Sequence, residues 1–370
     1  MRDLLAEQLL AKVMGWQPAD VAAERAVLRA LADHKYDDYQ QFVPGMRFLE
    51  SLASWLDQFK TPEEREIMYD FFKSRLVYFS TPEINHLVSI AYPDHIRPAL
   101  LARAGKEAGL NPWHVGKIAA TSEFRALQRR TLFLGLSDGA RTDVFRRANP
   151  HDLTNEQVRQ SHEVAELRVG KLLEKLSKGL SKILGVKPTE GACRFRSIVL
   201  LDDFSASGIS YIREEKGAYD GKIGSFLSAL LNPEQPLAQL VDPKDLEILV
   251  VLYIATEKAR SYLQSYLTKI CEPAGVASRV LVVYPLAADV AVSKGDHPAL
   301  DAIIEKYYDS DNETDSTKLG GTDLKYGFNG CALPVALSHN APNNSIGLLW
   351  AEGSNMRALF PRVTRHKDRV

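Results

Sequence analysis

The residues with the clearest chemical potential are two adjacent carboxylates, Asp202 and Asp203, which end the apolar run of residues 198–201. The acids lead into a loop made largely of small residues: Ser205, Ala206, Ser207, Gly208, Ile209 and Ser210. Paired carboxylates accept hydrogen bonds from a sugar diol, or hold a hydrated magnesium ion through water. Small side chains leave backbone amides free to converge on a phosphate group. The acids and the loop together predict a site for ribose 5-phosphate. The alternative is that the acids form the N-cap of a helix and have no role in binding.

The elements that must position this site are buried strands that alternate with helices. Strand-like apolar runs lie at residues 131–136, 197–201, 246–254, 279–284 and 345–350. Helical patterns separate the first four runs, at residues 154–183, 221–231 and 257–270, and the first of them begins with a capping box. This alternation predicts a parallel α/β sheet. Such sheets bind ligands at the carboxyl ends of their strands, where the acids lie, and we expect the N-terminus of the next helix to assist.

The first 125 residues are predicted to be entirely helical. Helix start signals recur at residues 61–64 (TPEE) and 80–83 (STPE), where an N-cap residue precedes a proline in the first turn. Apolar and aromatic residues, among them Trp55 and Phe72, follow at helical spacing, which is typical of a buried core. We therefore predict a helical domain over residues 1–125 and an α/β domain over residues 126–370.

Composition limits the class of protein. The chain of 370 residues is long enough for two domains. Its 46 basic and 47 acidic side chains nearly balance, so no overall electrostatic field attracts nucleic acid. No apolar run approaches the roughly 20 residues that span a bilayer, and the charged, amphipathic start of the chain is unlike a secretory signal. The isolated cysteines Cys193, Cys271 and Cys331 suit a reducing compartment. These features predict a cytoplasmic protein with no membrane partner.

Residues 198–210 resemble the phosphoribosyl pyrophosphate (PRPP) motif of type I phosphoribosyltransferases, in which four apolar residues and two acids precede a loop of the form x-x-x-[ST]-G-x-[ST]. The resemblance implies that Asp202 and Asp203 contact the ribose hydroxyls and that residues 205–210 bind the 5-phosphate. It also implies a pyrophosphate loop after the first strand, where this chain has Ser137, Asp138, Gly139, Ala140 and Arg141. By the same resemblance Arg141 would be catalytic together with the two acids. Mg²⁺ would arrive with the substrate's pyrophosphate, without a direct protein ligand.

Most of the chain is similar to the phosphoribosyltransferase-like proteins of prokaryotic conflict systems, the PRTase-CE family. The similarity rests on the helical N-terminal half and on three segments, LGLSDGARTDVFRR, DDFSASG and PNNSIGLLW. Members of that family occur in antiviral gene clusters, including some retrons, beside a reverse transcriptase. The resemblance implies a Rossmann-like α/β fold of the type I phosphoribosyltransferase kind, preceded by helices, and a role as a toxic effector in antiviral defence.

The chain departs from ordinary phosphoribosyltransferases in two respects. One charged helix fills most of the interval in which those enzymes have a flexible catalytic loop and extra strands, and no familiar hood for a purine or pyrimidine base is present. Ordinary base salvage is therefore in doubt. Three further residues are weaker site candidates: Lys258, Asn343 and Asn344. The alternative for Lys258 is an ordinary lysine at a helix start, with no role in the site. The alternative for Asn343 and Asn344 is a turn with a purely structural role.

Three functions are compatible with these features. The first is a phosphoribosyl transferase, or a nucleotide-consuming enzyme, that acts with Mg²⁺ on PRPP or a related nucleotide. The second is a catalytically inactive sensor of the same ligand. The third is a subunit that docks a partner through its helical half, such as a reverse transcriptase with its DNA–RNA product, a winged-helix protein or a second copy of the chain.

Overall fold

The computed structural model describes residues 2–161, 169–314, 317, 319–321, 323–353 and 356–363. The chain groups into two compact units, which are described separately: a sheet unit, residues 84–286, and a terminal unit, residues 1–83 with 287–370. This grouping differs from the division predicted at residue 125. Residues 84–125 belong with the sheet, and residues 287–370 belong with the N-terminal helices.

The sheet unit is built on a five-stranded parallel sheet with the spatial order β3-β2-β4-β7-β8. Its strands are β2 (Thr131–Gly135), β3 (Val158–Gln160), β4 (Ser197–Ser205), β7 (Glu247–Thr256) and β8 (Ala277–Leu286). Numbered along the chain, this is the 2-1-3-4-5 order of a doubly wound α/β fold, whose switch point lies between its first and third strands, here β2 and β4. The predicted parallel α/β fold is confirmed, and folds of this class bind ligands at the carboxyl ends of the strands that flank the switch point.

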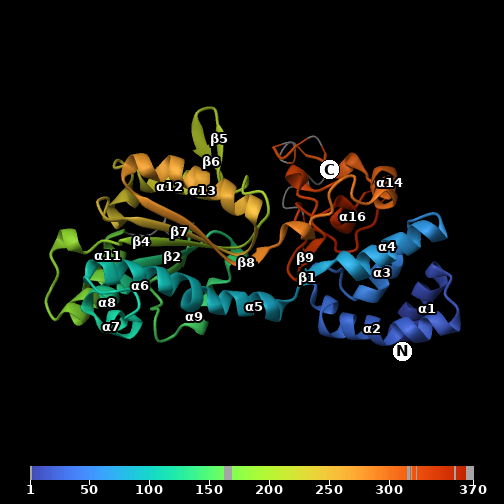
Figure 1. Cartoon of the computed structure of the whole chain (residues 1–370), viewed down its shortest axis with the longest axis horizontal. Helices are drawn as coiled ribbons and strands as arrows, with labels where there is room; N and C mark the ends of the chain where they lie inside the picture. Colours follow the sequence, from blue (N-terminus) through green and yellow to red (C-terminus); the bar gives the residue numbers. More distant parts are fainter. Residues whose placement is uncertain are drawn as a thin grey trace. The chain divides into compact units, whose positions relative to one another are not determined.

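Helices cover both faces of this sheet (Figure 1). On one face, α11 (Val169–Leu184), α12 (Lys222–Leu230) and α13 (Glu257–Cys271) pack into a core that includes Leu134, Leu200 and Val250. Side chains of successive strand residues point to opposite faces, so Phe133 faces the other side, where its ring lies 5.4 Å from that of Phe145 in α9 (Thr142–Ala148). Every residue of β2 is buried, as expected for a strand covered on both faces.

Shorter elements complete the sheet unit. They are α5 (Thr81–Ile90), which begins just before the unit, α6 (Arg97–Glu107), α7 (Val115–Ala120), α8 (Ser122–Arg129), and the antiparallel strands β5 (Arg213–Glu215) and β6 (Ala218–Asp220). Figure 1 shows the β5–β6 hairpin projecting beyond α12 and α13. Its two turn residues, Lys216 and Gly217, have φ values of 51° and 80°, the left-handed backbone that tight hairpins require.

The terminal unit joins the two ends of the sequence. Its elements are α1 (Arg2–Met14), α2 (Pro18–His34), α3 (Phe48–Asp57), α4 (Pro62–Arg75), β1 (Val77–Phe79), α14 (Pro298–Tyr307), β9 (Val335–Leu337) and α16 (Gly347–Trp350). Strands β1 and β9 pair in parallel, with Tyr78 opposite Ala336. Trp55 and Phe72 are buried, which confirms the predicted aromatic core, and Nε1 of Trp55 donates to the carbonyl oxygen of Leu348 at 2.7 Å.

The helix predicted over residues 154–183 is wrong in its first part. Residues 158–160 form strand β3, α11 begins at Val169, and residues 162–168 lie outside the described residues. The buried side chain of Gln157 explains the difference, because its Nε2 donates to the carbonyl oxygens of Gln128 at 2.7 Å and Thr131 at 3.0 Å. These bonds tie the segment to the sheet edge instead of starting a helix.

Two other predictions of secondary structure are also wrong. The predicted strand at residues 345–350 contains the short helix α16, because a brief apolar run fits either structure and Nε1 of Trp350 donates back to the carbonyl oxygen of Ser345 at 2.9 Å. The N-terminal region is not entirely helical, since β1 pairs with the distant strand β9. No helix among the described residues is long and apolar enough to cross a membrane.

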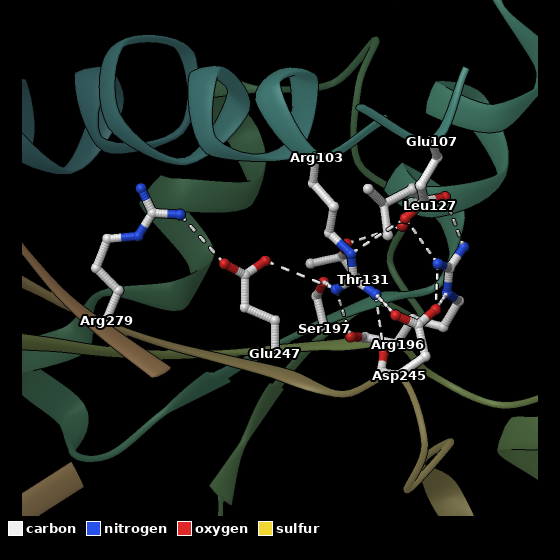
Figure 2. Close-up of polar contacts among 9 residues, drawn as sticks. All are labelled: Arg103, Glu107, Leu127, Thr131, Arg196, Ser197, Asp245, Glu247 and Arg279. Carbon is white, nitrogen blue, oxygen red and sulfur yellow. Dashed lines mark hydrogen bonds and ion pairs between the residues drawn. The ribbon is translucent and has the colours of Figure 1, made fainter. Parts of the chain in front are cut away.

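A network of charged residues ties α6 to the amino-terminal ends of the strands (Figure 2). Arg103 of α6 donates to the carbonyl oxygen of Arg196 at 2.9 Å, to Ser197 Oγ at 3.2 Å and to Asp245 Oδ1 at 2.7 Å. Arg196 in turn pairs with Asp245 and, at 2.7 Å, with Glu107. The side chains of Arg103 and Arg196 are each 16 % exposed. Removing Arg103 would leave the buried Ser197 hydroxyl and the carbonyl oxygen of Arg196 without this donor, whereas the Asp245 carboxylate is 44 % exposed and can be solvated.

We expect Arg103→Met to lower the free energy of unfolding by about 1–3 kcal/mol, because several partly buried acceptors lose their donor while the aliphatic packing is kept. Arg147→Met is the matched control, since Arg147 is 67 % exposed and pairs with Asp143 of its own helix; its effect should stay within about 0.5 kcal/mol. Urea unfolding of both variants measures the difference. Equal effects of the two substitutions would contradict a stabilising role for the network.

Candidate functional site

Two loops meet at the carboxyl ends of β2 and β4. Gly135, the last residue of β2, pairs with Leu201 of β4, so the residues that follow each of them lie at the same level of the sheet. The loop after β2, residues 137–141, is the predicted pyrophosphate loop. The loop that leaves β4, residues 205–210, is the predicted phosphate loop. Both loops therefore lie at the switch point of the fold.

The acid pair, Asp202 and Asp203, joins these loops. The Ser137 hydroxyl donates a hydrogen bond to Oδ1 of Asp202. A Cβ atom placed on Gly139 would lie 2.3 Å from Oδ2 of Asp203, so the absence of a side chain at Gly139 permits this close approach. The structure thus brings together two segments that the sequence shows about sixty residues apart. Both acids lie within β4, and the next helix begins only at Lys222, so the N-cap alternative is wrong.

Asp202 is the buried centre of the site, with 0 % of its surface exposed. Its Oδ2 lies 2.7 Å from Nζ of Lys222, and its Oδ1 accepts hydrogen bonds from Ser137 and, at 3.1 Å, from the amide of Asp203. Burial raises the pKa of Asp202, and the charge of Asp203 raises it further, against the lowering effect of Lys222 and Ser137. The ammonium group and the hydrogen bonds compensate the desolvation of this carboxylate.

Asp203 differs from its neighbour because its side chain is only half-buried. Its Oδ1 accepts a hydrogen bond from the amide of Phe204 at 2.8 Å. Within the acid pair, Asp203 is therefore the member that solvent reaches, whereas a sugar could contact Asp202 only after Ser137 or Lys222 had moved.

Two buried tyrosines hold the loops in place. The Tyr211 hydroxyl donates to the carbonyl oxygen of Phe204 at 2.8 Å, and the Tyr253 hydroxyl donates to the carbonyl oxygen of Ala140 at 2.7 Å. Burial raises the pKa of both phenols well above its ordinary value, and the charges of the acid pair raise it further. Both phenols therefore stay protonated and act as hydrogen-bond donors to the two loops.

The backbone amides of the two loops lack acceptors within the described part of the chain. This holds for Ser137, Asp138 and Gly139 in the first loop and for Ala206, Ser207, Gly208, Ile209 and Ser210 in the second. In the second loop, Ala206 and Ser207 are 1 % and 4 % exposed. Buried amides without an acceptor are rare in proteins, and successive free amides make an anion-binding concavity. The two loops therefore provide two adjacent sets of donors for phosphate oxygens.

The helix that follows the phosphate loop does not add its N-terminus to this donor set, so that expectation is wrong. The amide of Lys222 donates to the carbonyl oxygen of Ser210 at 3.3 Å. The amides of Ile223 and Gly224 donate to the carbonyl oxygen of Tyr211 at 2.8 and 3.1 Å. The chain itself thus caps α12 with the end of the loop, after the intervening β5–β6 hairpin.

Arg141 stands at a strained turn between β2 and α9. Its φ of 44° places a non-glycine residue in the left-handed region, which costs of order 1–3 kcal/mol and is concentrated at functional sites. Nη1 of Arg141 donates to Oδ1 of Asn85 in α5 at 3.1 Å. Asn85 therefore orients the guanidinium group that the sequence predicted as a pyrophosphate ligand.

Of the weaker candidates, Lys258 belongs to the sheet unit. It is exposed on the first turn of α13, two residues after Thr256, whose Oγ1 donates to the carbonyl oxygen of Ala206 in the phosphate loop at 2.6 Å. Asn343 and Asn344 belong to the terminal unit, where Nδ2 of the buried Asn344 donates to the carbonyl oxygen of Phe328 at 3.1 Å, as expected for a structural turn. Besides Thr256, sequence reasoning missed Asn85, Tyr211, Lys222 and Tyr253, each of which contacts a loop or the acid pair. None of them carries a local motif signal.

A model of one protein family, PRTase-CE, matches residues 52–362, a range that contains both loops, the acid pair and Lys222. The chain belongs to the PRTase-CE family. This membership confirms the resemblance inferred from the sequence, and it makes the function of this PRTase-CE protein phosphoribosyltransferase-like. No curated protein and no solved structure matches the chain.

We expect Gly139→Ala to lower the free energy of unfolding by about 1–3 kcal/mol, because the added methyl group would displace the Asp203 carboxylate. Gly191→Ala is the matched control. No atom would lie within 4 Å of its Cβ, and we expect no loss of stability or a gain of up to about 1 kcal/mol. Urea unfolding measures both effects. A Gly139→Ala variant as stable as the control would contradict the close approach of the loop to Asp203.

The raised pKa of Asp202 predicts a pH dependence of stability. The folded chain holds this proton more tightly than the unfolded chain, whose Asp titrates near the ordinary value of 3.8. The stability that the wild type has relative to Asp202→Asn should therefore be largest at acid pH and should fall as the pH rises above 3.8. Urea unfolding of the two proteins over a pH series tests this. A difference that grows with pH would show that the pKa is lowered instead.

Proposed function

We propose that this PRTase-CE protein binds the ribose 5-phosphate part of PRPP, or of a related nucleotide, at the β2 and β4 loops and transfers the phosphoribosyl group with Mg²⁺. The observation that supports this most directly is the close approach of Asp203 to Gly139, in a site whose two loops carry amides with no acceptor in the described part of the chain. A carboxylate suits a sugar diol, and convergent amides suit phosphate groups. One ligand that presents a diol between two phosphate groups matches this arrangement.

Each part of the site has a separate role in this proposal. Asp203 accepts hydrogen bonds from the ribose hydroxyls, and the amides of residues 206–210 bind the 5-phosphate. The amides of residues 137–139 and the guanidinium group of Arg141 bind the pyrophosphate. Asp202 acts beneath the ligand, where it holds Ser137 and Lys222 in position.

The reaction would be a displacement at C1 of the ribose. The bond from C1 to the pyrophosphate oxygen breaks, pyrophosphate leaves with the electron pair, and the acceptor forms a new bond to C1. Glycosyl transfer of this kind passes through an oxocarbenium-like transition state. Arg141 and the amides of the first loop would stabilise the charge that develops on the leaving group, and Asp203 lies on the side of the developing cation.

The donor set fits a magnesium ion that is carried by the substrate. No cluster of three His, Cys, Asp or Glu residues in the described ranges could hold a metal ion by itself. Asp203 and the exposed Asp138 are the carboxylates that would contact a hydrated Mg²⁺ bound to the pyrophosphate. When bound, the ion neutralises charge on the leaving pyrophosphate.

We further propose that the activity serves antiviral defence in a prokaryote, as the toxic step of a system that includes a reverse transcriptase or another partner. Membership of the PRTase-CE family supports this role. Transfer of a phosphoribosyl group would be harmful if it depleted a nucleotide pool or modified a nucleic acid or protein. Double substitution of Asp202 and Asp203 by Asn should then abolish toxicity in cells while the protein still accumulates, and unchanged toxicity would contradict a catalytic effector.

We expect Asp203→Asn to weaken PRPP binding by about 10- to 100-fold and to slow pyrophosphate release, because the neutral amide loses charge-assisted hydrogen bonds to the ribose. Asp143→Asn is the matched control, since the Asp143 side chain is 62 % exposed on α9 and pairs with Arg147. Calorimetry and a pyrophosphate assay with PRPP and Mg²⁺ measure the two effects. Tight binding without pyrophosphate release would identify a sensor, and unchanged binding by Asp203→Asn would contradict the proposed site.

A further inference from the structure

The phosphate loop needs a positive charge that neither its own residues nor the backbone amides of the next helix provide. A phosphate monoester carries close to two negative charges at neutral pH, whereas the loop offers amides and serine hydroxyls. The first amides of α12 already donate to the carbonyl oxygens of Ser210 and Tyr211. The buried carboxylate of Asp202 precedes the loop and would repel the phosphate if its own charge were not balanced.

Lys222 is placed to supply this charge. Its Nζ lies 2.7 Å from Oδ2 of Asp202, just before the loop, and 4.9 Å from the ring centroid of Tyr211, just after it. The backbone amide of the same residue donates to Ser210, the last residue of the loop. Lys222 therefore contacts the chain both before and after the loop. Its side chain is 40 % exposed, whereas Asp202 is fully buried, so Lys222 extends from the buried carboxylate to the surface.

Two arginines of the sheet unit are engaged elsewhere. Arg213 pairs with Glu215 at 2.6 Å and with Asp220, which closes the base of the β5–β6 hairpin. Arg141 belongs to the other loop and bonds to Asn85. An ammonium group has three donors, so Lys222 can keep its bond to Asp202 and still donate to a phosphate oxygen.

We propose that Lys222 is a phosphate-binding residue of this site, which neutralises Asp202 and donates to the 5-phosphate held by residues 205–210. The inference rests on the proposed anion-binding role of that loop and adds a residue that lies outside the PRPP motif. The β5–β6 hairpin connects the end of the phosphate loop to α12, whose first residue is Lys222. The hairpin and α12 (Figure 1) therefore help to position a residue that binds the ligand.

Calorimetry with inorganic phosphate and with ribose 5-phosphate tests the proposal. Lys222→Gln should weaken the binding of both ligands by about 10- to 100-fold, the loss expected for a hydrogen bond to a charged group, while Lys222→Arg should retain most of the affinity. Lys178→Gln is the matched control, since Lys178 is 72 % exposed on α11. It removes one positive charge without touching the site and should bind as the wild type does.

The double variant Asp202→Asn with Lys222→Gln guards against a folding defect, because it removes the buried ion pair as a unit. We expect it to bind phosphate more weakly than the wild type, because the donor is lost, but less weakly than Lys222→Gln, because the repulsion by Asp202 is removed as well. Phosphate binding as tight as in the wild type, in a folded double variant, would overturn the proposal, and so would a wild type that binds no phosphate. If phosphate binding depends on Lys222 but ribose 5-phosphate binds the wild type no more tightly than phosphate, the proposal for Lys222 stands and the proposed ribose site fails.

Discussion

The buried carboxylate of Asp202 is the constraint on which the site depends. A charge with no exposed surface is stable only if donors surround it, and here the donors come from three separate segments: Ser137 after β2, Lys222 at the start of α12, and the amide of Asp203. Satisfying one carboxylate therefore fixes the relative positions of two loops and a helix. Such preorganisation is what a site needs to bind a charged ligand without rearrangement.

The switch point of the sheet explains why the site lies where it does. The chain leaves β2 toward β3 on one side and returns as β4 on the other, so two loops diverge from adjacent strand ends. Gly139 then allows the first loop to approach Asp203, and Tyr253, from the neighbouring strand β7, holds that loop by its Ala140 carbonyl group. Several backbone amides of the two loops have no acceptor among the described residues. The amino-terminal edge of the same sheet carries the Arg103 and Arg196 network, whose groups are bonded to one another.

The sequence by itself determined the features that depend on local pattern. Apolar runs bounded by turns predicted β2, β4, β7 and β8. In β2, β4 and β7 these runs are buried, because strands covered on both faces must be largely apolar, whereas β8 at the sheet edge is mostly half-buried or exposed. The acid pair and the loop of small residues predicted the kind of ligand. The helical N-terminal half and the three segments that resemble PRTase-CE proteins predicted the family that the match over residues 52–362 then established. The same local signals misled at residues 154–157 and 345–350, where a capping pattern and a short apolar run fit more than one structure.

Only the tertiary structure decided how the two acids divide their work. Adjacent residues of one strand point to opposite faces, so Asp202 enters the interior and Asp203 stays within reach of solvent, a difference that the letters DD do not contain. The same holds for Asn85, Lys222 and Tyr253, which reach the site from elements that are distant in the chain. It holds as well for the pairing of β1 with β9, which joins the two ends of the sequence in one unit. These contacts depend on which surfaces meet after folding, and no spacing along the chain encodes them.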